Sequence, residues 1–171
     1  RFNFFTPAGL AVDNNPNSPY FGRIYVTESR EGVTTKSGRT AQQGIYIYGA
    51  DLSDITQQGL NPYVGGVSWN TSNEDSDNDE NRDSMYGPAR IAIDDDGSVY
   101  ICDNGPSKDN TSGVWRMDPA NPSANFVDVL HSSENRGKLY QRINSAAIVQ
   151  ENGRKYLYAV DNTCLNNSVA N

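Results

Sequence analysis

The chain has 171 residues, of which 36% are hydrophobic, and its 14 Lys and Arg against 21 Asp and Glu give a net charge of −7. This charge repels nucleic-acid phosphates and anionic membrane surfaces, so nucleic-acid binding is not expected. No apolar run approaches the roughly 20 residues that cross a bilayer, so membrane insertion is not expected either.

Short β-type strands are predicted along the whole chain from alternating polarity and from β-branched and aromatic residues. No stretch of more than about ten residues keeps a helical period without Gly or Pro. The strands fall into two groups of four and one of two, and residues 1–5, with Phe2 and Phe4 on one face, fit a further strand. The groups cover 9–12, 23–27, 45–48 and a weaker 63–64; then 90–93, 99–102, 114–117 and 126–130; then 146–149 and 156–160.

The strand groups also repeat each other in sequence. Residues 7–13 match 88–94 in apolar and small character, 22–29 match 97–104 and 155–162, and 44–48 match 113–117. Self-similar groups of this kind are typical of propeller blades or of another β array. Tight turns are predicted at 94–97 and 151–153 from their Asp, Asn and Gly residues.

The repeat reads Pro-x-Gly-Ile/Leu-Ala-Val-Asp, a short turn, Gly-x-Ile/Val-Tyr-Val-x-Asp/Glu-Ser/Asn and a later Gly-Ile/Val strand. Over about residues 7–162 it resembles NHL-type repeats and the related six-bladed gluconolactonase-like (regucalcin-like) β-propellers. The resemblance implies an all-β fold of four-stranded antiparallel blades. Blade 1 would cover about 7–65, an inserted acidic loop 66–87, blade 2 about 88–130 and a partial blade 3 about 144–171. Pro7 and Pro88 lie farther apart than the ~40–50 residues of one blade, so long insertions between strands are expected.

Two and a half blades are fewer than the roughly 4–8 of closed propellers. An open array would leave sheet faces and edges without partners. We therefore expect the chain to be an incomplete part of a larger ring of about six blades, with the rest of the propeller outside this chain. The sequence begins at Arg1 without an initiator Met or a signal peptide, so we expect a processed, excised or incompletely represented protein.

The insertion contains a candidate calcium site. Asp75, Asp77 and Asp79 alternate along the chain, and Asp83 follows. Alternating carboxylates let a looping backbone aim oxygens at one hard cation, as at the start of an EF-hand loop. The match then ends, because Glu80 replaces the turn Gly and Tyr86 stands where the bidentate Glu belongs. A calcium site and a solvated acidic loop both stay open.

A second polar set comes from the repeat itself, because a carboxyl residue ends the second strand of each repeat and Ser or Asn follows it. In a closed ring these residues would point toward one mouth of the channel, on the same face as the insertion. The resemblance implies that gluconolactonase-like enzymes hold a divalent metal in that channel with Glu, Asn and Asp side chains, but no full ligand set can be assigned. The alternative role is loop capping by Asx-type hydrogen bonds. The residues are Glu28 with Ser29, Asp103 with Asn104, and Asp161 with Asn162.

Aromatic and nucleophilic residues give fewer candidates for a functional site. Trp69, in the insertion, is a candidate for stacking on a sugar, whereas Trp115, at an alternating strand position, is expected in the core. His131 is the only histidine and no Gly-x-Ser-x-Gly elbow occurs, so no Ser-His-Asp triad is predicted. Cys102 is expected to be a buried thiol, and a disulfide with Cys164 stays open.

These features favour a non-enzymatic ligand-binding propeller of a secreted or surface protein. Its ligand would be a carbohydrate or a protein, bound on the face that carries the long segments 28–43, 65–87 and 103–112. The expected location is extracellular, periplasmic or cell-surface, and the expected cofactor is calcium or none. The alternative function is a metal-dependent lactonase or related hydrolase, in which a channel cation polarises a carbonyl or activates water.

Overall fold

The fold is described from a computed structural model of the chain. It describes residues 4, 7–29, 40, 42–55, 61–67, 69, 87–104, 113–131 and 143–161. Within these residues the regular secondary structure consists of β-strands, with no helix. The predicted all-β class is therefore confirmed for the part of the chain that is described.

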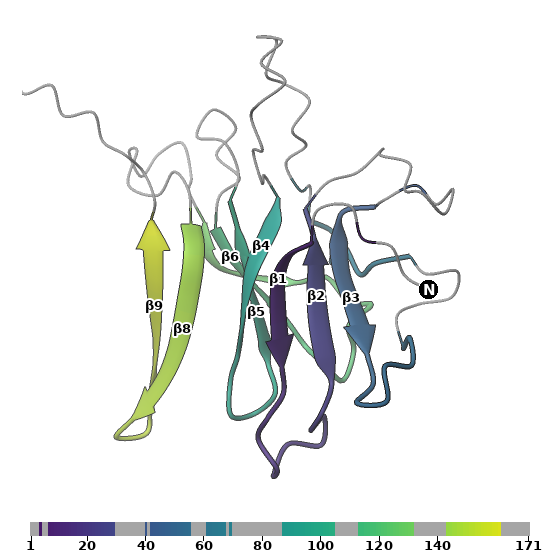
Figure 1. The fold of residues 1–171 in the computed structure, drawn as a ribbon. Coiled ribbons are helices and arrows are strands. Elements are labelled where there is room, and N and C mark those ends of the chain that lie inside the picture. The colour runs from purple at the N-terminus through teal and green to yellow at the C-terminus, as the bar shows by residue number, and fades with distance from the viewer. Residues whose placement is uncertain are drawn as a thin grey trace, which may run out of the picture.

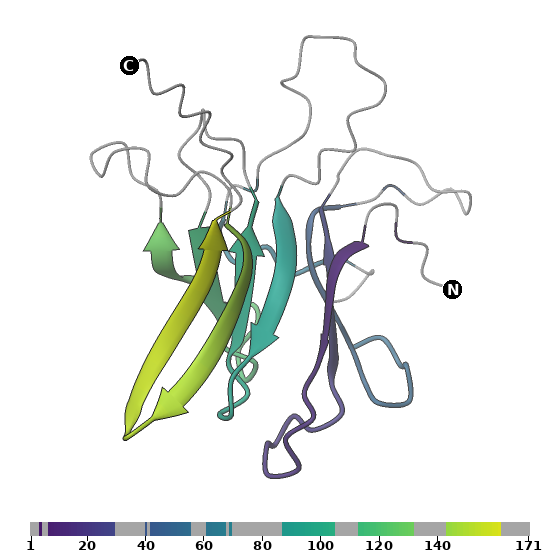
Figure 2. The same ribbon diagram turned by 60° about the vertical axis from the view of Figure 1, so that its left-hand side comes forward.

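The strands form three antiparallel sheets, shown in Figures 1 and 2. None of these sheets closes on itself within the described residues. In every sheet the strands lie in chain order. Sheet 1 contains β1 (Pro7–Val12), β2 (Ile24–Glu28) and β3 (Gly44–Tyr48); sheet 2 contains β4 (Pro88–Ile93), β5 (Val99–Asp103), β6 (Gly113–Met117) and β7 (Val127–His131); sheet 3 contains β8 (Ile143–Glu151) and β9 (Arg154–Asp161).

The same irregularity occurs near the start of the first strand of every sheet. In β1 the register with β2 shifts between Pro7 and Gly9, and equivalent shifts occur in β4 and β8. A β-bulge bends its strand and increases the local twist. Since the bulge recurs at the equivalent place, the three sheets are copies of one structural unit, as the sequence repeat predicts.

The sheets stack face to face with their first strands side by side. β4 packs against β1 on one side and β8 on the other (Figure 1). Because sheet 2 is covered on both faces, β5 is buried along its whole length. Ile91 and Ile93 of β4 pack against the first of three core clusters. The first cluster, between sheets 1 and 2, includes Tyr25, Ile45, Ile47, Val99, Ile101 and Met117, and the second, between sheets 2 and 3, contains Tyr100, Cys102, Val114 and Ile143. The third, called the outer cluster of sheet 1, contains Val26, Tyr46 and Tyr48.

Both tight turns form where the sequence predicts them. Asn152 and Gly153 join β8 to β9 with φ of 50° and 71°. Two central residues with positive φ are typical of a type I′ hairpin turn, which suits Asn-Gly. The backbone N–H of Gly97 donates to the carbonyl oxygen of Asp94 at 2.9 Å and closes the turn between β4 and β5.

The weak fourth strand predicted at 63–64 does not form a strand. Tyr63 makes only an isolated antiparallel bridge with Ile45 of β3. Gly65 and Gly66 follow with φ of 60° and 70°, which turns the chain away from an extended course. Of residues 1–5, Phe4 alone is described; it is not in a strand, and its ring packs edge-to-face on Tyr46 at 5.3 Å. The rest of that predicted strand lies outside the described residues.

Two edges run across the stack of sheets. We call the edge where β2, β5 and β9 end the long-loop edge, because the connections 29–43, 104–112 and 132–142 join strands there. The opposite edge, called the turn edge, carries the turns at 94–97 and 152–153. Figure 1 shows the strands of all three sheets running between these two edges.

Candidate functional site

The long-loop edge brings carboxyl residues to equivalent positions in the three sheets. Glu28 ends β2, Asp103 ends β5 and Asp161 ends β9, each paired with the first residue of the neighbouring strand. This is the arrangement of strand ends that the repeat predicts. For Asp161 the structure describes the backbone position, and Asn162 lies outside the described residues.

The side chains of Glu28 and Asp103 at this edge are buried. Glu28 is 1% exposed and Asp103 is 0% exposed. Strand alternation puts Glu28 on the same face as Val26, which belongs to the outer cluster of sheet 1. Alternation puts Asp103 on the face of Ile101, which belongs to the cluster between sheets 1 and 2. The two carboxyls therefore share an edge and occupy separate layers of the stack.

Burial changes the protonation of Asp103. Desolvation disfavours the charged carboxylate and raises the pKa of Asp103 to about 8. Near neutral pH the carboxyl is therefore mostly protonated. A protonated carboxyl donates one hydrogen bond and still accepts others, whereas a carboxylate only accepts.

Buried polar side chains surround the end of β2. Thr27, Ser29 and Gln43 are all buried. The side-chain amide of Gln43 donates a 2.7 Å hydrogen bond to the carbonyl oxygen of Ser29. This bond joins the residue that follows β2 to the residue that precedes β3, so both ends of the 29–43 connection are held together at the long-loop edge.

Asn104 connects the end of β5 to the end of the acidic insertion. Its backbone N–H donates to the carbonyl oxygen of Gly87 at 3.0 Å. Gly87 directly precedes β4 and has a φ of 93°, a conformation that favours glycine. The last residue of the 66–87 insertion thus lies at the long-loop edge beside Asn104, whose side chain is half-buried.

Trp69 is part of the core. It is 8% exposed and belongs to the cluster between sheets 1 and 2. Its ring lies edge-to-face with Trp115 at 6.5 Å and tilted against Phe126 at 6.3 Å. In this position the indole face is not open to a sugar. Trp115 packs against the same cluster, as its strand position predicts.

The remaining predicted residues fall largely outside the described part of the chain. The candidate calcium ligands Asp75, Asp77, Asp79 and Asp83 lie there, so the calcium site stays a prediction. Among the residues that are described, no group of three or more His, Cys, Asp or Glu is arranged to hold a metal. Cys102 is buried and free, and burial together with Asp103 raises the pKa of its thiol to about 12.

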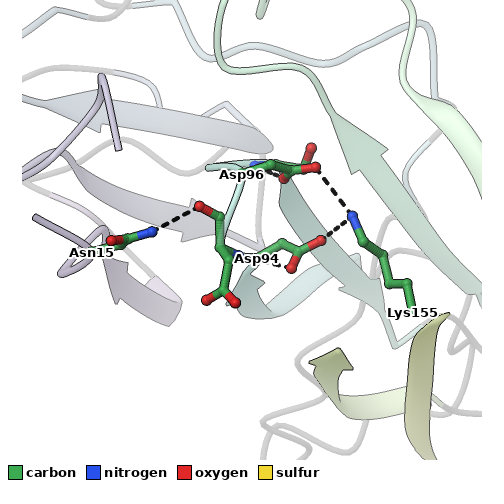
Figure 3. Close-up of polar contacts among 6 residues, drawn as sticks. Asn15, Asp94, Asp96 and Lys155 are labelled. Atoms are coloured by element: carbon green, nitrogen blue, oxygen red, sulfur yellow. Dashed lines mark hydrogen bonds and ion pairs between the residues drawn. The ribbon is translucent and has the colours of Figure 1, made fainter. Parts of the chain in front are cut away.

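The turn edge holds an ion pair that the sequence did not predict (Figure 3). Lys155 of β9 forms salt bridges with Asp94 and with Asp96, the latter at 3.1 Å. Beside them the side-chain amide of Asn15 donates to the carbonyl oxygen of Asp95 at 2.8 Å. These contacts tie the 94–97 turn of sheet 2 to sheets 1 and 3. The sequence signal that could have predicted this ion pair is Lys155 near the turn of the third repeat, because the equivalent turn of the second repeat is acidic.

In the described residues no helix is both long and apolar enough to cross a membrane. Comparisons with models of protein families, with curated proteins and with solved structures found no match.

Proposed function

We propose that the chain forms part of a β-propeller and binds a carbohydrate at its long-loop edge without catalysing a reaction. The stacked sheets support the propeller part of the proposal, because their first strands lie side by side and each repeats the same bulge. Propellers are built by radial repetition of antiparallel sheets.

One observation carries the choice of the long-loop edge. The long connections 29–43, 104–112 and 132–142 leave the sheets there, and the 66–87 insertion returns to it at Gly87. The strand ends beneath them are fixed by the Gln43 to Ser29 and Asn104 to Gly87 hydrogen bonds. Loops held on a rigid scaffold are where proteins concentrate binding residues.

The chemistry of the edge favours a carbohydrate over a protein ligand. The residues at the ends of β2 and β5 have hydroxyl, amide and carboxyl side chains, and all of them except Asn104 are buried. The amide of Asn104 can both donate to and accept from a polyhydroxyl ligand. Protein interfaces are instead enriched in aromatic residues and depleted in Ser, Asp and Glu. In this proposal the buried carboxyls shape the edge, and Asn104, which is half-buried, contacts the ligand. The residues concerned are Thr27, Glu28, Ser29, Gln43, Asp103 and Asn104.

The test is a glycan array probed with the purified chain, followed by calorimetry with the glycan that binds best. Asn104→Ala should weaken binding by up to about tenfold, the effect of one lost hydrogen bond. Asn15→Ala is the matched control, because Asn15 lies at the turn edge, and it should bind like the parent protein.

Absence of glycan binding by the parent protein, or equal affinity of the Asn104 and Asn15 variants, would overturn the proposal. Turnover of a sugar lactone that appears only after addition of a divalent cation would instead support the metal-dependent hydrolase.

A further inference from the structure

The outward face of sheet 3 is apolar and exposed. We call it the β9 face, and it faces away from sheet 2. Tyr158 is 59% exposed and Val160 is 60% exposed. Figure 1 shows β9 at one end of the stack, with sheet 1 toward the other end. The β9 face consists of Ala147 and Val149 of β8 and Tyr156, Tyr158 and Val160 of β9.

The tyrosine of this face has a counterpart in each of the other sheets. Tyr25, Tyr100 and Tyr158 each pair with an alanine in the first strand of their own sheet. Tyr25 is 0% exposed because sheet 2 covers it, and Tyr100 is 4% exposed because sheet 3 covers it. Tyr158 therefore holds a position that the following sheet buries in both earlier repeats.

A second position repeats the pattern. Thr27, Cys102 and Val160 all directly precede the carboxyl residue that ends their strand. Thr27 and Cys102 are buried between sheets, whereas Val160 is exposed. Tyr158 and Val160 are therefore both exposed where their equivalents in the other sheets are buried, so the whole β9 face is exposed and not one side chain alone.

The opposite end of the stack presents the complementary surface. Leu10 and Val12 of β1 are 66% and 43% exposed. Their equivalents in β4, Ile91 and Ile93, pack against the cluster between sheets 1 and 2. We call the exposed surface of Leu10 and Val12 the β1 face. Equivalent surfaces cover the tyrosine-bearing face of the preceding sheet twice within this chain: β4 covers Tyr25 and β8 covers Tyr100.

We propose that the β9 face of one copy of this chain binds the β1 face of a second copy. The chain already makes this contact twice internally, where β4 packs on sheet 1 and β8 packs on sheet 2. When both faces of each copy are used, two copies bring six sheets together, within the roughly 4–8 blades of closed propellers. The proposal does not depend on carbohydrate binding, since neither face includes the long-loop edge.

The contact has a distinctive dependence on salt. Both copies carry a net charge of −7, so they repel each other at low ionic strength. The two faces themselves are apolar, and salt screens the repulsion without weakening an apolar contact. Association should therefore become tighter as salt is added.

The test is the molar mass of the full chain by light scattering during size-exclusion chromatography, over a dilution series. The parent protein should have twice the mass of one chain. Tyr158→Glu and Leu10→Glu should each have the mass of one chain, because each loses one half of the contact. An equimolar mixture of these two variants should recover pairs, since one intact β9 face and one intact β1 face remain.

Phe21→Glu and Leu52→Glu are the matched controls, because both side chains are exposed and lie outside the two faces, at 60% and 70% exposure. They should pair like the parent protein. Far-ultraviolet circular dichroism checks that all four variants keep the β-fold. A single-chain mass for the parent protein would overturn the proposal and point to a sheet from another polypeptide. Pairing that survives Leu10→Glu but not Tyr158→Glu would also overturn it, because the β9 faces would then bind each other.

Discussion

Thr27 of β2 donates a 2.6 Å hydrogen bond from its hydroxyl to the carbonyl oxygen of Ala89 in β4. This bond crosses from sheet 1 to sheet 2. Gly9 of β1 lies at the same place, and a Cβ on it would overlap the Ala89 carbonyl oxygen. The absence of a side chain at Gly9 is therefore what lets the two sheets meet.

Gly9→Ala should destabilise the protein by about 1–3 kcal/mol, the usual cost of overpacking a well-packed site. The added methyl must push apart β1 and β4, since the nearest atom is backbone and not a flexible side chain. Urea unfolding followed by fluorescence measures the change. Arg90→Ala, at the exposed equivalent position of β4, is the control and should change stability by less than about 0.5 kcal/mol. Equal stability of the two variants would show that β1 and β4 are not as closely packed at Gly9 as the structure indicates.

Lys155→Met should cost about 1–2 kcal/mol, because it leaves the buried carboxylate of Asp94 without its cation while Lys155 itself is 37% exposed. Hydrogen bonding to Asp94 raises the pKa of Lys155. Although burial raises the pKa of Asp96, hydrogen bonds from Ser98 and Lys155 outweigh it and lower that pKa from 3.8.

The difference between the parent and Lys155→Met should therefore depend on pH in a defined way. A raised lysine pKa contributes stability that is present below its ordinary value of 10.5 and is lost as pH rises further. A lowered carboxyl pKa contributes stability that is present above 3.8 and is lost in acid. Unfolding at several pH values should show a plateau between about pH 5 and 10. Arg154→Met, an exposed neighbour, should show no such plateau, and the same profile in both variants would argue against the ion pair.

Asp103→Asn should change the pH dependence of stability. Burial raises the pKa of Asp103 to about 8, so the folded state holds this proton between pH 4 and 8 while the unfolded state loses it. Stability of the parent should therefore fall as pH rises through this range, by at most about 1.4 kcal/mol per pH unit from this group. The variant should gain stability relative to the parent from pH 4 to 8, as measured by thermal unfolding. Asp95→Asn, at an exposed position of the 94–97 turn, should follow the parent, and a parallel profile for Asp103→Asn would contradict the buried, protonated carboxyl.

Trp69→Ala should destabilise the protein by about 3–5 kcal/mol, as expected for an aromatic removed from a core. The ring supports Trp115 and Phe126 in the cluster between sheets 1 and 2, and its loss leaves a cavity there. Denaturant unfolding gives the energy, and near-ultraviolet circular dichroism reports the loss of Trp69 packing on Trp115. Trp69→Phe should recover part of the stability. Wild-type stability of Trp69→Ala would mean that the ring is not in the core and is available to a ligand.

Local patterns were sufficient to predict most strands and turns. The β-branched and aromatic residues of 99–102 predict β5, and Asn152-Gly153 predicts the hairpin between β8 and β9, because both depend on neighbouring residues along the chain. The repeat also predicts that Glu28 and Asp103 share an edge, since antiparallel register fixes which strand ends lie together. The prediction of a weak strand at 63–64 was wrong, because two glycines with positive φ follow Tyr63 and end the extended conformation that its β-type residues favour.

By itself the sequence determined the strand pattern, the repeat and the edge to which each carboxyl belongs. Only the tertiary structure decided the solvent exposure of each residue. It buries Trp69, although this residue belongs to the insertion, and it buries Asp103, so that its carboxyl keeps a proton. It also pairs Lys155 with an acidic turn of another sheet. Tyr25 and Tyr158 show the reason, since equivalent positions are 0% and 59% exposed according to whether another sheet covers them. Strand formation depends on neighbouring residues in the chain. Burial and ion pairing depend on which sheets stack on each other, and that stacking is determined by residues distant in sequence.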